Sequence, residues 1–263
     1  MTTSAQAPAA CTLRWQPGQV LLYHVEHTTA NFDKEGEKEA ETKSLLKVTK
    51  RWDVVSVDAS GIATLKLSLV AMLHERTTPS GEVLRFDSAN PDKSTPQLKE
   101  AMSHFVNTPL ATIRVDPYGR VVEVKEAKSG ASSFENELPF LALLPGVLPK
   151  PGQGWERAYK ITLAPPLGTG EKYDAFQHFT CKSITGDLMT LSLTSELKNP
   201  PKAPADTIPL WQMLPQGEIV FDVKAGRLHS AKLTIQKELK DHQGEGSVTK
   251  FQSTLTLSWA GDK

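Results

Sequence analysis

The sequence predicts a mainly β protein made of large antiparallel twisted sheets, arranged as a sandwich or as an open half-barrel. One to three short helices and an internal pseudo-repeat complete this fold class. The alternation of apolar and polar residues over 62–73 has the period of a strand. Turns such as Asp58-Ala-Ser-Gly61 separate such segments. Four aliphatic side chains share one face of this strand: Leu65, Leu67, Leu69 and Ala71.

A hairpin pattern occurs twice and predicts the pseudo-repeat. Residues 113–124 and 219–228 each hold an apolar strand that closes with an Asp, then a Gly-Arg pair that opens the next strand. Pro-Gly-Gln precedes the first strand of each half, at 17–19 and 151–153. We therefore expect one β domain of two similar halves, about 14–148 and 149–263, in which 14–125 and 150–240 superpose. No third copy is present, which argues against a propeller or solenoid.

The other elements follow from the same patterns. Residues 1–13 are expected to be a disordered arm, and the charged residues 33–43 a solvated loop between strands. Helices are expected at 96–106, which begins with Thr95-Pro96, over part of 134–144, and for one turn at 211–214. Further strands are predicted over 20–27, 44–57, 155–163, 173–184, 188–197 and 248–259.

Composition excludes several classes of protein. The chain has 263 residues, with 30 Lys+Arg and 30 Asp+Glu, so its formal net charge is zero. A nucleic-acid-binding protein normally carries a basic excess, so no nucleic-acid partner is expected. The longest apolar stretch, 138–148, is too short to span a bilayer, which takes about 20 residues. No integral membrane segment is therefore expected.

The two cysteines, Cys11 and Cys181, leave two alternatives open. They are either unrelated thiols or one disulfide, which needs an oxidising compartment and Cα atoms within roughly 7 Å. Residues 1–10 lack the basic start and apolar core of an intact signal peptide. The location is therefore left open, and is periplasmic or extracellular if an export signal has been trimmed.

No catalytic, cofactor or metal site is predicted. His24 and His27 differ by three positions, so in a strand they lie on opposite faces and do not chelate one ion. Asp116 and Asp222 are better explained as acceptors for the amides of their own turns. The segment 168–172 lacks the spacing of a phosphate loop and is expected to be a hairpin loop.

Five short motifs stand out: Pro17–Tyr23, Trp52–Val57, Phe86–Ser88, the helix start at Pro96, and Asp116–Val121. Together they resemble the DUF6263-like group of bacterial proteins, which are often exported or lipid-anchored. The resemblance implies no activity, cofactor or catalytic residue. In style of fold, the chain is also similar to periplasmic lipoprotein carriers, in which short helices plug an open curved sheet.

These observations predict a non-enzymatic binding protein of the cell envelope or secreted space. Its partner is expected to be an apolar small molecule or another protein. One alternative is a structural or interaction module without a small-molecule site, and another is a hydrolase whose site is formed by loops. If the sheet curves as a half-barrel, too few helices remain to fill it. The expected cavity lining is Leu65, Leu67, Leu69, Leu191, Leu193, Leu255 and Leu257.

Overall fold

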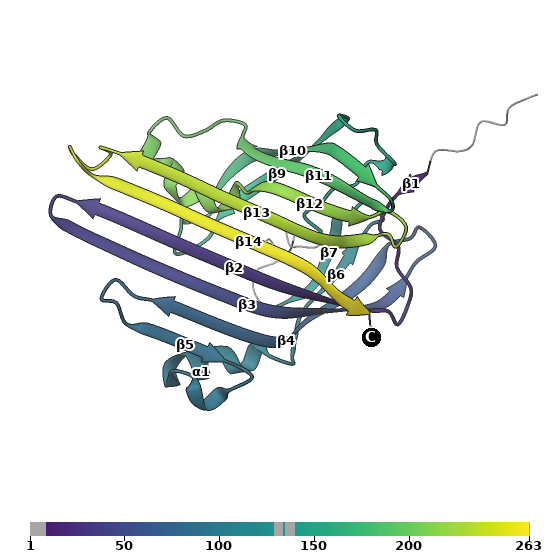
Figure 1. Ribbon diagram of the computed structural model, residues 1–263, viewed down its shortest axis with the longest axis horizontal. Helices are drawn as coiled ribbons and strands as arrows, with labels where there is room; N and C mark the ends of the chain where they lie inside the picture. Colours follow the sequence, from purple (N-terminus) through teal and green to yellow (C-terminus); the bar gives the residue numbers. More distant parts are fainter. Residues whose placement is uncertain (1–8, 129–133, 135–139, 263) are drawn as a thin grey trace, which may run out of the picture.

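The computed structural model describes residues 9–128, 134 and 140–262, and most of them belong to one antiparallel sheet of twelve strands (Figure 1). The first half contributes β2 (Val20–Glu35), β3 (Lys38–Val57), β4 (Ala63–Thr77), β5 (Val83–Asp87), β6 (Pro109–Val115) and β7 (Val121–Ala127). The second half contributes β9 (Gly154–Leu163), β10 (Glu171–Thr185), β11 (Leu188–Leu197), β12 (Gln216–Asp222), β13 (Arg227–Lys240) and β14 (Val248–Asp262). A separate two-stranded sheet pairs β1 (Ala10–Cys11) with β8 (Gly146–Val147).

The large sheet is open, and its order is β7-β6-β4-β3-β2-β14-β13-β12-β11-β10-β9, with β5 paired to β4. The sheet curls, so that β6 and β7 lie behind β2, β3 and β14 in Figure 1. This confirms the mainly β fold class and selects the open curved arrangement over a sandwich. The C-terminal strand β14 lies between β2 and β13, and so joins the two halves.

The β2–β3 hairpin is longer than expected, and the prediction of a loop over 33–43 is wrong. The two strands stay paired to Glu35 and Lys38, and the turn is confined to Gly36 and Glu37. Gly36 has a φ of 59°, which a two-residue hairpin turn requires and glycine adopts without strain. Charged side chains pair across the two strands of this solvated hairpin and stabilise it. The ammonium group of Lys34, for example, lies 2.8 Å from the carboxylate of Glu39.

Helices are few. The helix expected at 96–106 is confirmed as α1 (Pro96–Met102) followed by the short 3₁₀ helix η2 (Ser103–Phe105), and η1 (Pro91–Lys93) precedes them. The turn expected at 211–214 belongs to a longer 3₁₀ helix, η4 (Pro204–Met213). The helix expected within 134–144 falls largely outside the described residues. Of it, the structure describes residue 134 and residues 140–144, and the latter form a turn and then an irregular segment.

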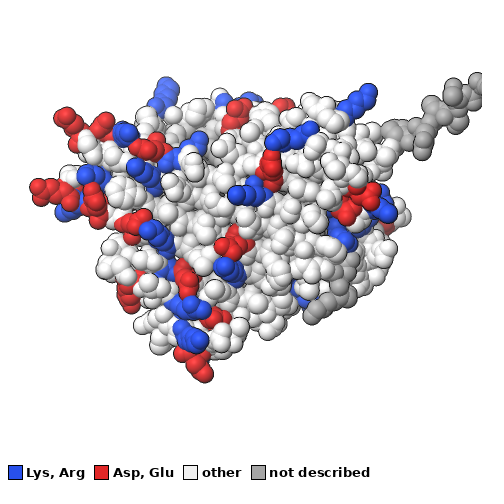
Figure 2. Space-filling model, in the orientation of Figure 1, with Lys and Arg blue, Asp and Glu red and all other residues white. Residues whose placement is uncertain are grey.

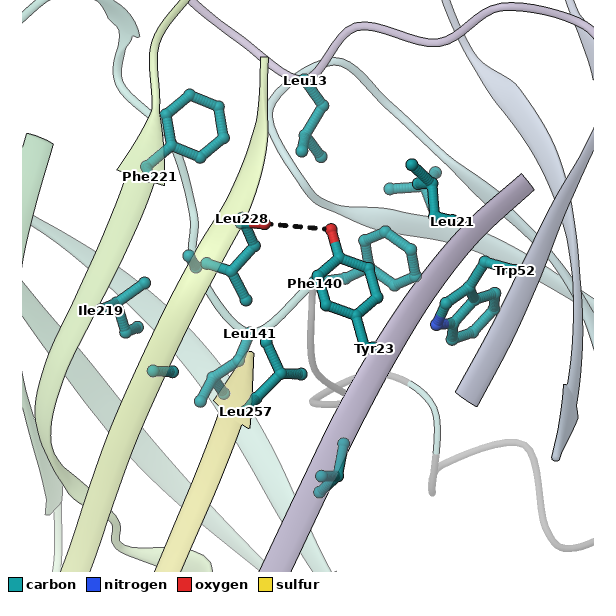
Figure 3. Close-up of a cluster of buried hydrophobic side chains, with 14 of the residues drawn as sticks. Leu13, Leu21, Tyr23, Trp52, Phe140, Leu141, Ile219, Phe221, Leu228 and Leu257 are labelled. Carbon is teal, nitrogen blue, oxygen red and sulfur yellow. Dashed lines mark hydrogen bonds between the residues drawn. The ribbon is translucent and has the colours of Figure 1, made fainter. Parts of the chain in front are cut away.

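Both halves contribute to one core on the concave face of the sheet (Figure 3). Tyr23 of β2 lies beside Leu228 of β13, and its hydroxyl donates a hydrogen bond to the Leu228 carbonyl at 3.2 Å. Phe140 packs edge-on against Trp52, with ring centroids 5.0 Å apart, and is fully buried. The segment 140–144 therefore fills one end of the curved sheet.

The N-terminal segment differs from the disordered arm expected over 1–13, because from residue 9 onward it is part of the structure. Cys11 and Leu13 are buried, and the Leu13 amide donates to the Pro117 carbonyl at 2.7 Å. The next amide, that of Arg14, donates to the Gly226 carbonyl at 2.9 Å. Because Pro117 and Gly226 lie in the two Asp-Gly-Arg hairpins, this segment ties the turns of the two halves together.

The two halves have the same order of strands. β2-β3-β4-β6-β7 and β9-β10-β11-β12-β13 are both antiparallel meanders, and they run in the same sense along the sheet. Gly18 and Gln19 exchange backbone hydrogen bonds with Val54 at 2.8 and 2.9 Å. Equivalent bonds join Gly152 and Gln153 to Cys181 at 2.7 and 2.9 Å. A register shift follows each partner, between Val54 and Ser56 and between Cys181 and Ser183.

The convex face of the sheet carries charges of both signs. In Figure 2, Lys and Arg side chains lie among Asp and Glu side chains, mostly toward the left of this face. Lys47 lies 3.0 Å from Glu26 on this face, so neighbouring strands pair their charges. Within the described part of the chain, no helix is long and apolar enough to cross a membrane.

Candidate functional site

A hollow of about 580 Å³ lies on the concave face, beyond the end of the core that 140–144 fills. Strands β2, β3, β13 and β14 form one wall, β9 forms the opposite wall, and η4 lies at the rim. Leu141 separates the hollow from the packed core. Its apolar lining consists mainly of Val25, Leu46, Val48, Ile161, Met213, Leu233, Ile235 and Leu255.

The seven leucines expected to line a cavity all belong to the concave side, but they divide into two groups. Leu255 lines the hollow. The other six are packed in the core with exposures of 7% or less: Leu65, Leu67, Leu69, Leu191, Leu193 and Leu257. Alternation therefore predicted their face correctly, but it does not tell which part of a curved face is filled.

Polar side chains gather inside the hollow, and the sequence analysis did not select them. His27 and Ser253 meet there, with Nε2 of the imidazole 2.8 Å from the serine Oγ. Burial, and secondly the positive charge of Lys50, lower the pKa of His27 below its usual 6.5. His27 is therefore largely neutral at pH 7, and Lys50 lies close enough to act on it.

Gln177 of β10 also lines the hollow and is almost fully buried. The guanidinium of Arg157 donates to its side-chain oxygen at 2.5 Å. A buried amide needs its hydrogen bonds, so this contact holds the Gln177 side chain in one orientation. Gln177 thus adds an oriented amide group to the lining.

Two hydrogen bonds fasten the rim to the sheet, at the carbonyls of Met213 and Pro215. The Tyr159 hydroxyl donates to the Met213 carbonyl at 2.9 Å, and the Ser195 hydroxyl donates to that of Pro215 at 2.7 Å. Burial raises the pKa of Tyr159 to about 12, so the phenol keeps its proton at neutral pH. Both bonds hold the end of η4 over the hollow.

A second hollow, of about 360 Å³, involves residues of the convex face such as His24 and Glu26. His24 bonds Thr49 through Nδ1 at 3.1 Å, and Glu26 pairs with Lys47. His24 and His27 thus lie on opposite faces, as expected. We take the inner hollow as the candidate site because it is the larger of the two and lies on the concave face.

Several other predicted features have structural roles. Asp116 accepts hydrogen bonds from the amides of Tyr118 and Arg120, at 2.9 and 2.8 Å, and so stabilises its own turn. Asp222 accepts one from Ala225 at 2.7 Å. Among the described residues, no group of three or more His, Cys, Asp or Glu side chains is placed to hold a metal ion.

The fold and the hollow define an open, curved antiparallel sheet with an apolar internal site. No protein-family model matches the sequence. No curated protein matches it either. Among solved structures, DynF from the dynemicin biosynthesis pathway of Micromonospora chersina aligns with 98% of this chain and 92% of its own, at 7% identity and a TM-score of 0.24. The resemblance to the DUF6263-like group stays a prediction.

Proposed function

We propose that this protein binds an apolar small molecule in the inner hollow. The observation that supports this most directly is the hollow itself, about 580 Å³ in volume and lined mainly by aliphatic side chains. Ligand pockets usually measure about 300–1,000 Å³ and combine apolar walls with a few polar groups. We also propose that the protein is located in the cell envelope or secreted space, because its motifs resemble those of the DUF6263-like group.

The expected affinity is moderate. Each methylene group buried in such a site gains about 0.8 kcal/mol, so a chain of about eight gains roughly 6 kcal/mol before the costs of association. The hydrogen bonds of Tyr159 and Ser195 hold the rim in place without a ligand. Less free energy is therefore spent on ordering the site when a guest enters.

Titration of the purified protein with N-phenyl-1-naphthylamine, an uncharged dye that fluoresces in apolar surroundings, tests the proposal. Leu255→Trp should fill part of the hollow and weaken binding at least about tenfold. Val55→Trp is the matched control, because Val55 is 57% exposed and the larger side chain meets solvent there. If the dye does not bind saturably, or if both variants bind it equally well, the protein is better described as an interaction module.

A hydrolase is the second candidate, favoured by the 2.8 Å contact between His27 and Ser253. A neutral imidazole in this position is able to take the proton of a serine hydroxyl. These two residues lie in strands, whereas the predicted hydrolase site was formed by loops. Release of p-nitrophenol from p-nitrophenyl octanoate, lost in Ser253→Ala, would support hydrolysis. No release above that of Ser253→Ala would leave binding as the function.

A further inference from the structure

We infer that the outer edge of β9 pairs with the same edge of a second copy of this chain, so that two sheets join about a two-fold axis. The two β9 strands run antiparallel in this dimer and meet at Ala158. The inference does not depend on a ligand in the hollow. It rests on how β9 differs from the other edge strands of the sheet.

Three strands of the large sheet pair on one side only: β5, β7 and β9. The edge of β5 is covered, because the Arg85 carbonyl accepts from the Thr95 amide at 2.7 Å and the Arg85 amide donates to the Thr95 hydroxyl at 2.9 Å. On β7, two register shifts against β6 leave Val122 and Lys125 as bulged residues. Covering segments and bulges both prevent an edge strand from pairing with another chain.

The edge of β9 has neither protection. Its ladder with β10 is regular over ten residues, without a register shift or a proline. The Gln153 carbonyl accepts from the Cys181 amide at 2.9 Å, and main-chain groups alternate in direction along a strand. Those of Glu156, Ala158 and Lys160 therefore point away from β10. Within the described part of the chain, these groups have no partner on that side.

The exposed side chains of this edge complement one another about Ala158. Antiparallel pairing centred there places Glu156 of each copy opposite Lys160 of the other, and cross-strand pairs of opposite charge stabilise a ladder. Within one copy, Lys160 already lies 2.9 Å from Asp174, and Glu156 lies 3.6 Å from His178. The dimer thus extends the side-chain pairs of β9 and β10 across the new contact.

Charge also selects this register over its neighbours. A shift that centres the pair on Glu156 would place two carboxylates opposite each other, and one that centres it on Lys160 would do the same with two ammonium groups. Like charges directly opposite destabilise a ladder. A second copy in the register centred on Ala158 is therefore the strand that fits this edge.

Sedimentation velocity over a range of protein concentrations tests the inference, with the unmodified protein expected to dimerise reversibly. Glu156→Lys or Lys160→Glu alone should weaken the dimer at least about tenfold, because each replaces two attractive pairs by two repulsive ones. The double variant with both changes should restore most of the affinity. Glu123→Lys is the matched control, because it makes the same charge change on the bulged strand β7.

A cysteine at the two-fold axis tests the register directly. Residues opposite each other in a hydrogen-bonded antiparallel pair have Cα atoms about 5.5 Å apart, which a disulfide spans. Oxidation should therefore join two copies of Ala158→Cys on a non-reducing gel. Ala127→Cys, an exposed alanine on β7, should not be joined. The two native thiols are buried and do not interfere.

The remaining outcomes overturn the inference. A protein that stays monomeric at every concentration does not pair through β9. A dimer that Glu156→Lys and Lys160→Glu leave unchanged forms through another surface. If the double variant fails to restore the dimer, or if both cysteine variants are joined equally, the strands do not meet at Ala158. Thermal unfolding of each variant shows whether a loss of the dimer reflects a loss of the fold.

Discussion

The imidazole of His27 lies 2.8 Å from the hydroxyl of Ser253, although the two residues are 226 positions apart in the sequence. They meet because β14 pairs with β2 at the centre of the sheet, where Leu255 is the direct partner of His27. The polar end of the hollow is therefore assembled from the first and the last long strands.

The stability of the protein should depend on pH through His27. Burial, and secondly the charge of Lys50, lower the pKa of His27, so the folded protein carries a neutral imidazole at pH 7.

The unfolded chain takes up a proton below pH 6.5 that the folded His27 resists, so the free energy of unfolding should fall as the pH decreases from 7 to 5. His27→Asn should remove this part of the pH dependence, measured by urea unfolding at both pH values. An equal fall in the variant would show that His27 does not cause it.

Leu65→Ala should destabilise the protein far more than Leu255→Ala. Leu65 is fully buried in the packed core, where such a change costs about 2–5 kcal/mol. Leu255 borders the hollow and has neighbours on fewer sides, so we expect a cost of roughly 1 kcal/mol. Urea unfolding of both variants measures the difference. Equal losses would mean that the hollow is filled.

Asp87 should contribute to stability in mildly acidic solution and lose that contribution at low pH. Its hydrogen bond with Arg85 and contacts with Asn90 and Ala89 hold the pKa of the carboxyl at about 2. The stabilisation is complete above pH 3.8 and disappears as pH falls through about 2, and it amounts to roughly 2 kcal/mol.

Asp87→Asn should therefore lower the free energy of unfolding at pH 5 by about 2 kcal/mol and by much less at pH 2, measured with urea. Asp92→Asn is the control, because the side chain of Asp92 is fully exposed. A loss in Asp87→Asn that does not change with pH would show that the contribution is not electrostatic.

If the two halves are a structural repeat, two distant glutamines should contribute equally to stability. The side-chain oxygen of Gln19 accepts the amide of Gln16 at 3.3 Å, and that of Gln153 accepts the amide of Lys150 at 3.2 Å. Ala at either position should cost about 0.5–1 kcal/mol, whereas Gln16→Ala should cost less. An experimental structure should superpose 14–125 on 150–240. If the strands of the two halves run in different directions, the repeat is a similarity of sequence and not of structure.

The thiols of Cys11 and Cys181 should react only after unfolding. Both are free and fully buried, and burial, with a smaller effect of Cys181, raises the pKa of Cys11 to about 11. Thiolate is the reactive form, so Ellman's reagent should label neither thiol in the folded protein and both in urea. If two thiols appear in urea only after a reductant is added, the disulfide alternative is correct.

Local patterns predicted the strands, the turns and α1, because alternation, glycines and the Thr95-Pro96 start act over a few residues. They did not decide between a sandwich and an open curved sheet, and they missed the burial of Cys11 and Leu13, because both depend on contacts between distant segments. The longer β2–β3 hairpin was missed because charged residues were taken to indicate a loop.

A signal for the site was nevertheless present in the sequence. His27 continues the apolar face of Tyr23 and Val25, and Ser253 continues the face of Leu255 and Leu257. Each is a polar residue on a face that is otherwise buried. Alternation places such residues on the inner side, but only the pairing of β2 with β14 brings them together.

The central position of β14 affects how the chain folds during its synthesis. The meander of β2 to β7 leaves the ribosome first, and the edge of β2 has no partner until β14 follows it, more than 200 residues later. At 5–20 residues per second, that interval lasts roughly ten to forty seconds. An unpaired strand edge is a template for intermolecular pairing. A lower growth temperature and a larger supply of chaperones should therefore increase the fraction of newly made protein that escapes aggregation.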